Sequence, residues 1–251
     1  MTLWTPAELG SSIIFGQWDA STLSGADNSN VSSWADSSDN GRTLSTGATP
    51  PKLRTSVGEK QNGLNTVQIS TSIFDSRQFW YKAGSEVTCN GMFAISVYKC
   101  VTGVTNARVV DVSGRVQHTA QTVGFSQGLV SFSNAATGWT FTLTFRQGIT
   151  HTQTVIIGQD MLHSGSPPYE VQATPYNESA DFQLVGSVAE VLILRTIPFA
   201  DIRRRIEGYI AHKWGITSVL ASDHPYKITA PTIDEPPAAS ERVLHPIQLS
   251  L

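Results

Sequence analysis

A strand, a helix and a Pro/His turn follow one another without interruption over residues 189–227. Val191 begins a short apolar run that is typical of a buried strand, and apolar residues recur at helical spacing after it. Pro198 suits the first turn of a helix, where no backbone donor is needed, and Gly215 suits a left-handed C-terminal cap. The sequence therefore predicts one amphipathic helix over about residues 199–214.

The rest of the chain is typical of β-structure. Charged residues make up only 15% of the 251 residues, and the chain contains 20 glycines, which favours short strands and tight turns over helices. The predicted strands cover residues 13–15, 66–69, 92–99, 108–112, 122–132, 140–145, 152–157 and 182–194. Strands without regular intervening helices indicate an all-β domain of two packed antiparallel sheets, with the late helix closing an edge.

Residues near both ends of this domain resemble the LamG-like, or concanavalin A-like, jelly-roll proteins found among tailed-phage structural proteins and bacterial surface proteins. The residues that carry the resemblance are 4–9 (WTPAEL), 18–21 (WDAS), 31–42 (VSSWADSSDNGR), 189–193 (AEVLI), 205–215 (RIEGYIAHKWG) and 223–226 (DHPY). The resemblance implies a two-sheet antiparallel jelly-roll sandwich over residues 1–227. It also implies a non-enzymatic virion protein, either a capsid-decorating or a tail-associated adhesion subunit. Its partners would be copies of itself, other virion proteins and, for an adhesion subunit, host surface glycans.

Charge and hydropathy exclude two classes of partner. The formal net charge of −3 gives no electrostatic reason to bind nucleic acid. No apolar run approaches the ~20 residues that span a bilayer, and no secretory leader is expected at the N-terminus. We therefore expect no membrane insertion, synthesis in the host cytoplasm and a final location in the virion.

Enzymatic signatures are weak, and we expect no enzyme. Residues 124–128 (GFSQG) fit a nucleophile elbow, but no helix follows, so a glycine-flanked turn is favoured. A glycoside hydrolase of the same fold would need two carboxylates set across a cleft, and the acidic residues here are scattered. Glu190 is predicted to pair with an arginine or a backbone group at the sandwich rim. Arg203, Arg204 and Arg205 are predicted to lie on a solvated helix face.

One segment supports a calcium site. Asp36, Ser38 and Asn40, followed by glycine, match the first half of a calcium-binding loop, and Asp19 is a further possible ligand. The glutamate that such a loop needs in its second half is missing, because Gly47 occupies that position. The alternative is a turn stabilised by its own side-chain hydrogen bonds. Calcium is the one cofactor that the sequence suggests.

Aromatic residues offer two roles. Those in turn-rich sequence are candidates for stacking on sugar rings, with burial as the alternative: Trp80, Tyr81, Trp139, Tyr169 and Tyr176. A lectin-like carbohydrate-binding module is therefore the alternative function. The tryptophans within the resemblance, Trp4, Trp18, Trp34 and Trp214, are predicted to pack in the core.

The C-terminal residues 228–251 differ from the domain in composition. Four prolines are spaced along this segment, which excludes a helix or a central strand. We expect an extended arm that lies on a neighbouring subunit, and its apolar contacts would be Val243, Leu244, Ile247 and Leu249. The alternative is that the segment packs back on its own domain.

Overall fold

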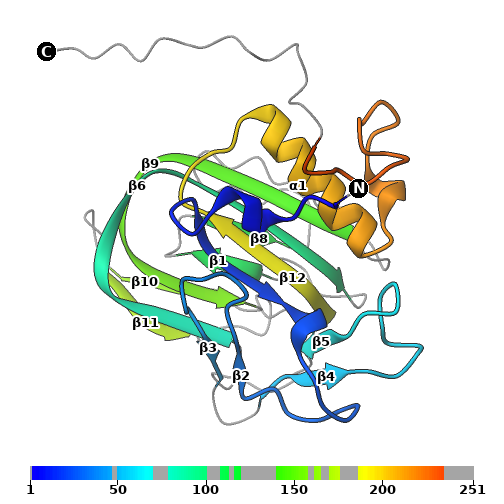
Figure 1. Ribbon diagram of the computed structural model, residues 1–251. Coiled ribbons are helices and arrows are strands. Elements are labelled where there is room, and N and C mark those ends of the chain that lie inside the picture. Colours follow the sequence, from blue (N-terminus) through cyan, green and yellow to red (C-terminus); the bar gives the residue numbers. More distant parts are fainter. Residues whose placement is uncertain are drawn as a thin grey trace, which may run out of the picture.

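The computed structural model describes residues 2–46, 50–69, 79–100, 108–112, 116–119, 140–157, 161–164, 170–175 and 186–234. Strands dominate these residues, and α1 (Ala200–Lys213) is the single α-helix among them (Figure 1). Every strand pair that the described residues form is antiparallel. The predicted all-β class with one late helix is confirmed.

Ten strands form one sheet, and two more pair separately. The strands are β1 (Ile14–Asp19), β2 (Ser33–Trp34), β3 (Leu44–Ser45), β4 (Lys52–Arg54), β5 (Thr66–Ile69), β6 (Phe79–Cys100), β7 (Arg108–Val112), β8 (Val116–Thr119), β9 (Thr140–Ile157), β10 (Met161–Ser164), β11 (Glu170–Pro175) and β12 (Gly186–Leu194). The order along the large sheet is β4-β5-β12-β6-β9-β7-β8. β1 also pairs with β12, β3 joins β2 to β6, and β10 with β11 forms the separate pair.

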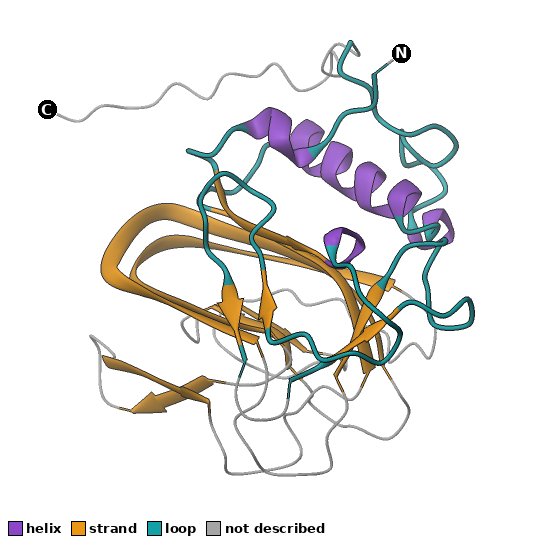
Figure 2. Cartoon of the chain, turned by 60° about the horizontal axis from the view of Figure 1, so that its bottom comes forward, coloured by secondary structure: helices purple, strands orange, loops and turns teal. Residues whose placement is uncertain are grey.

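β12 lies at the centre of the sheet. One of its edges pairs with β6, and the other pairs with β5 near its start and with β1 near its end. All nine residues of β12 are buried, as are all six of β1. A strand with both faces covered needs a continuous apolar run rather than alternation. α1 lies across one face of the sheet and covers that side of β12 (Figure 2). The apolar run that starts at Val191 provides the side chains that such a buried strand needs.

β6 and β9 are longer than predicted. β6 begins at Phe79 rather than near residue 92, and β9 joins the two strands predicted over 140–145 and 152–157. Glycine and polar residues between the apolar runs suggested a break. The ladder instead continues through them, with a register shift between Lys82 and Glu86 that accommodates the irregular residues. The two strands run together through a pronounced bend (Figures 1 and 2).

Helix α1 begins and ends within one residue of the predicted limits, 199 and 214. Ile206, Ile210 and Ala211 lie on its buried face and pack in a core cluster with residues of β12 and β6. Gly215 adopts φ = 65°, which confirms the left-handed cap. Helices also leave their last carbonyls without internal partners. Here the side chain of Gln61 donates to the Trp214 carbonyl oxygen at 2.6 Å, a contact between distant segments that the sequence did not predict.

The segment after α1 folds back along the helix. It contains η4 (Thr217–Val219) and a turn in which Tyr226 N donates to His224 Nδ1 at 3.2 Å. His212 Nε2 lies 2.8 Å from the Tyr226 carbonyl oxygen, which ties this turn to the last turn of α1. His224 therefore lies in a structural turn, as predicted. None of the described helices is both long and apolar enough to span a bilayer.

The start of the predicted C-terminal arm contacts its own domain. Trp4 N donates to the Pro231 carbonyl oxygen at 3.0 Å, and Ile233 N donates to the Thr2 carbonyl oxygen at 3.0 Å. These bonds form a short antiparallel bridge centred on Leu3 and Thr232. The first residues after 227 therefore pack back on their own domain as far as Ile233, which is the alternative that the sequence offered for this segment. The predicted arm contacts Val243, Leu244, Ile247 and Leu249 lie outside the described residues.

Candidate functional site

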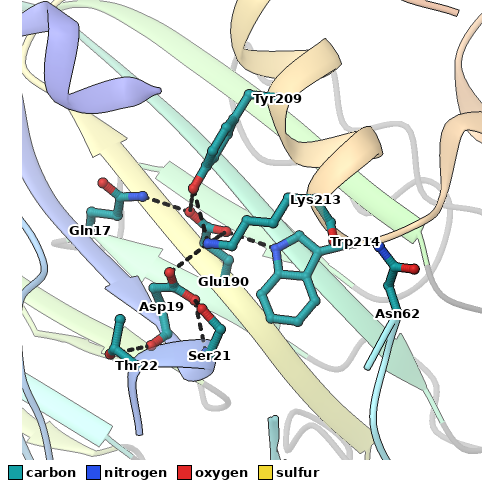
Figure 3. Close-up of polar contacts among 9 residues, drawn as sticks. All are labelled: Gln17, Asp19, Ser21, Thr22, Asn62, Glu190, Tyr209, Lys213 and Trp214. Carbon is teal, nitrogen blue, oxygen red and sulfur yellow. Dashed lines mark hydrogen bonds and ion pairs between the residues drawn. The ribbon is translucent and has the colours of Figure 1, made fainter. Parts of the chain in front are cut away.

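A fully buried carboxylate organises a polar cluster between the sheet and the helix. Glu190 lies on β12 directly opposite Asp19 of β1, and its side chain is 0% exposed. Its Oε1 atom accepts from Gln17 Nε2 at 2.6 Å and from the Tyr209 hydroxyl at 3.2 Å. Its Oε2 atom accepts from Trp214 Nε1 at 2.7 Å (Figure 3). β12 thus supplies the acceptor, while β1, α1 and the residue that follows α1 each supply one donor.

Lys213 completes this cluster from the last turn of α1. Its Nζ atom lies 2.7 Å from Glu190 Oε2 and 2.5 Å from Asp19 Oδ2, and it donates to the Tyr209 hydroxyl at 2.9 Å. The side chains of Lys213 and Asp19 are only 16% and 11% exposed. Figure 3 shows the amine directed between the two carboxylates. One ammonium therefore faces two carboxylates in a site largely closed to water.

Asp19 is held by residues of its own turn. Its side chain caps η2 (Ala20–Thr22), because Oδ1 accepts from Ser21 N at 2.9 Å and from Ser21 Oγ at 2.6 Å. Oδ2 is thereby left to face Lys213. The two oxygens of this carboxylate thus have separate roles, one fixed by the turn and one aimed at the amine.

The electrostatics of the cluster follow from its burial. Burial raises the pKa of Glu190, and the Lys213 ammonium opposes that shift while Asp19 adds to it. Burial and the negative charges of Glu190 and Asp19 also raise the pKa of Tyr209 far above its usual value. Tyr209 therefore stays a neutral phenol, and its hydroxyl can both donate to Glu190 and accept from Lys213.

The prediction for Glu190 was wrong in two respects. The residue lies in the interior rather than at a rim, and its ion-pair partner is Lys213 rather than an arginine. Sequence reasoning treated each member of the cluster in a separate context, since Asp19, Glu190 and Lys213 lie far apart in the chain. The pairing of β1 with β12 brings Asp19 opposite Glu190, and the packing of α1 on the sheet brings Lys213 to both of them. A single acidic residue within an apolar strand was the available signal, because a buried charge requires a partner.

The arginine run also differs from its prediction. Arg205 is buried, with a relative exposure of 7%, and Arg203 forms an ion pair with Glu207 at 3.4 Å. A cleft of about 480 Å³ lies between this part of α1 and the turn that carries His224. The Arg203, Arg204 and Arg205 side chains that line it are matched by the carboxylates of Asp201, Glu207 and Asp223. The cleft thus has no dominant charge that would select a ligand of one sign.

The segment predicted to bind calcium forms a compact turn. Asp36 Oδ1 accepts from Gln17 N at 2.9 Å, from Ser38 N at 2.9 Å and from Ser38 Oγ at 2.7 Å. Asn40 directs its Nδ2 donor to the Ile14 carbonyl oxygen at 2.9 Å. Across the described residues, no group of three or more His, Cys, Asp or Glu side chains is arranged to hold a metal ion. Asp19 has partners different from those of Asp36, so the structure does not join the four predicted ligands around one point.

The predicted sugar-binding aromatics are only partly within the described structure. Trp80 and Tyr81 are neighbouring residues of β6, where Trp80 pairs with Ser45 of β3 and with Ile156 of β9. Trp139, Tyr169 and Tyr176 lie outside the described residues. The shared sugar platform therefore stays a prediction. The core tryptophans are confirmed: Trp4, Trp18, Trp34 and Trp214 are all buried.

The fold and site define an all-β protein in which the buried strand β12 is tied to α1 by a buried ionic cluster. Comparison with protein-family models, curated proteins and solved structures found no match to this chain.

Proposed function

We propose that this chain is a non-enzymatic structural protein of a tailed-phage virion, built on a LamG-like jelly roll. The observation that carries the proposal is that segments with the resemblance at both ends of the chain form one packed unit. β1 pairs with β12 beside α1, and Lys213 of α1 bonds to Asp19 at the end of β1. The polar residues of these segments bond to one another, which suits a scaffold more than a substrate site.

The jelly-roll architecture is the finer part of the proposal. It is supported by the long β6–β9 pair, whose bend lets one sheet turn back toward itself (Figure 2). β6 also pairs with a further strand on each side of the bend. It pairs with β12 from Phe93 onward and with β3 at Trp80. Closing a curved antiparallel sheet in this way protects its edges from pairing with other chains. An experimental structure with two facing sheets would support this architecture, and an open single-layer sheet would contradict it.

Within a virion, the chain would assemble with copies of itself and with other virion proteins, on the capsid or on the tail. Immunogold labelling of intact particles with antibody against the recombinant protein tests the proposal and separates the two locations. Gold over the heads would support capsid decoration. Gold on tails or fibres would support adhesion, and a glycan array would then test Trp80→Ala and Trp139→Ala for lost saccharide binding. Particles without gold, and without peptides of this chain in their mass spectra, would contradict the virion assignment.

The C-terminal arm is proposed as the assembly contact, with Val243, Leu244, Ile247 and Leu249 as its apolar residues. The structure allows a sharp truncation, because the bridge between Leu3 and Thr232 ends before residue 235. A chain cut after Asp234 keeps that bridge and removes only the remaining arm. Unchanged oligomer mass and unchanged incorporation into particles would contradict the arm. A matched control replaces the four apolar residues with serine and keeps the length.

A further inference from the structure

The buried cluster around Lys213 places an amine against two carboxylates. Lys213 Nζ lies 2.5 Å from Asp19 Oδ2 and 2.7 Å from Glu190 Oε2. With all three groups ionised, the site would hold a net negative charge. Burying uncompensated charge is costly, so a proton shared within the cluster, or the removal of charges altogether, is favoured. A condensation between amine and carboxyl would remove one positive and one negative charge together.

The environment of Asp19 suits attack by the amine. Attack on a carboxyl carbon places negative charge on the oxygen that remains, and donors fixed at that oxygen stabilise it. Asp19 Oδ1 already accepts from Ser21 N at 2.9 Å and from Ser21 Oγ at 2.6 Å. Oδ2, the oxygen that would leave, is the one in contact with Lys213 Nζ.

Glu190 is placed to carry protons between the reacting groups. Its Oε2 atom contacts the same Lys213 nitrogen, and Gln17 Nε2 and Trp214 Nε1 hold its two oxygens at 2.6 and 2.7 Å. A carboxyl group fixed within hydrogen-bond distance of a reacting nitrogen can act as general base and then as general acid. Burial raises the pKa of Glu190, which makes it a better proton acceptor than an exposed glutamate.

Aromatic rings enclose the amine. Nζ of Lys213 lies 5.3 Å from the centroid of the Tyr209 ring and 5.2 Å from that of Trp214. Such enclosure excludes bulk water, which favours a reaction that releases water and hinders the reverse hydrolysis.

We propose that Lys213 and Asp19 condense into an intramolecular amide bond, with Glu190 as the proton carrier. Lys213 first passes a proton to Asp19 Oδ2, which gives a neutral amine and a neutral carboxyl group. The Nζ–Cγ bond forms, Glu190 takes a proton from the nitrogen and gives it to Oδ2, and the Cγ–Oδ2 bond breaks. One water leaves, Glu190 returns to its starting state, and nothing is oxidised or reduced.

This bond would close a covalent loop of nearly the whole domain, because its ends lie 194 positions apart. It would lock the end of β1 to the last turn of α1. Cross-links that close long loops restrict the unfolded chain most. The proposal does not depend on a virion role.

The test is the intact mass of the purified full-length protein, followed by a tryptic peptide map. Condensation lowers the mass by one water, about 18 Da. Trypsin should then release residues 1–42 joined to residues 206–227, with no cleavage after Lys213. Full mass in folded protein after prolonged incubation would overturn the proposal. An 18-Da deficit that maps to any other position, such as an aspartate cyclised to a succinimide, would also overturn the proposal.

Variants separate the roles within the cluster. Lys213→Arg should restore full mass and normal cleavage. Lys227→Arg is the matched control, because Lys227 Nζ donates to the backbone carbonyl oxygens of Thr217, Ser218 and Leu220, away from the cluster. This variant should keep the deficit. Glu190→Gln should lack the bond or form it much more slowly while circular dichroism shows a folded protein. Bond formation at the parent rate in Glu190→Gln would overturn the role of Glu190. The intact mass of the wild-type protein shows whether the amide bond forms, even if one of the variants fails to fold.

Discussion

Gly208 offers a sharp test of how closely α1 packs against the segment that follows it. A glycine inside a helix is normally unfavourable, and replacing it with alanine stabilises an exposed helix by about 1 kcal/mol. At this position, however, an added Cβ atom would lie 2.5 Å from Tyr226 Cβ and 2.7 Å from Tyr226 Cγ. Carbon atoms pack best at about 3.5–4.0 Å. Gly208→Ala should therefore destabilise the protein rather than stabilise it.

The magnitude follows from what must move. The nearest atom is the Cβ of Tyr226, which is fixed to the backbone and cannot move away unless the backbone moves with it. Overpacking of this kind costs about 1–3 kcal/mol. The displacement also strains the bond between His212 Nε2 and the Tyr226 carbonyl oxygen, and a hydrogen bond contributes about 1 kcal/mol. Subtracting the helix gain of about 1 kcal/mol leaves a net loss of about 1–3 kcal/mol.

Urea unfolding followed by tryptophan fluorescence would measure this loss as a lower midpoint with an unchanged slope. Tyr226→Gly is the matched background, because it removes the atoms that the new Cβ would meet. In that background Gly208→Ala should be stabilising, so the sign of its effect should reverse. Equal or greater stability of Gly208→Ala in the parent protein would refute the close contact between α1 and Tyr226.

Three further predictions each concern one polar side chain. The carboxylate of Asp27 accepts hydrogen bonds from two backbone N–H groups, which lower its pKa below 3.8. Its stabilising contribution should therefore be present above pH 4 and lost as the pH falls through the lowered pKa. An NMR titration that gives Asp27 a pKa of 3.8 or higher would contradict this prediction. Asp36→Ala removes the acceptor for four donors and should lower the unfolding free energy by about 3 kcal/mol, whereas Asp36→Asn should cost less, as measured by urea unfolding. Gln61→Ala leaves the Trp214 carbonyl without its side-chain donor and should cost about 1–2 kcal/mol, and an unchanged melting curve would show that the cap contributes nothing.

The sequence predicted local structure well where the hydrophobic pattern was strong. α1 and the apolar strand before it were found because an apolar run was followed by helical spacing that ends at a glycine with the predicted left-handed conformation. Pro198 lies one residue before the N-cap Phe199 and not in the first turn, where it was predicted. β5 and β7 were predicted at their observed bounds. β6 was predicted too short, because glycine and polar residues in its first half hide a ladder that a neighbouring strand maintains. Pairing with a partner strand decided that outcome, and single-sequence periodicity does not contain it.

The buried cluster could not be predicted in the same way. Asp19, Glu190 and Lys213 carried no shared spacing, and their meeting depends on the register of β1 against β12. A shift of that register by one residue would turn Asp19 to the other face of the sheet. The cap of α1 by Gln61 is equally non-local. Such contacts follow from topology, so a sequence indicates only that a buried charge must have some partner.

The position of Lys213 explains why this cluster belongs at the end of α1. A cation in the last turn of a helix faces the negative end of the helix dipole, so the helix itself favours the charge there. Trp214, the next residue, donates to Glu190, and Gly215 then turns the chain away from the helix. Three consecutive residues thus hold the charge, satisfy the buried acceptor and end the helix. The residues Lys213, Trp214 and Gly215 within the resemblance are thus accounted for by the buried cluster and by the end of the helix.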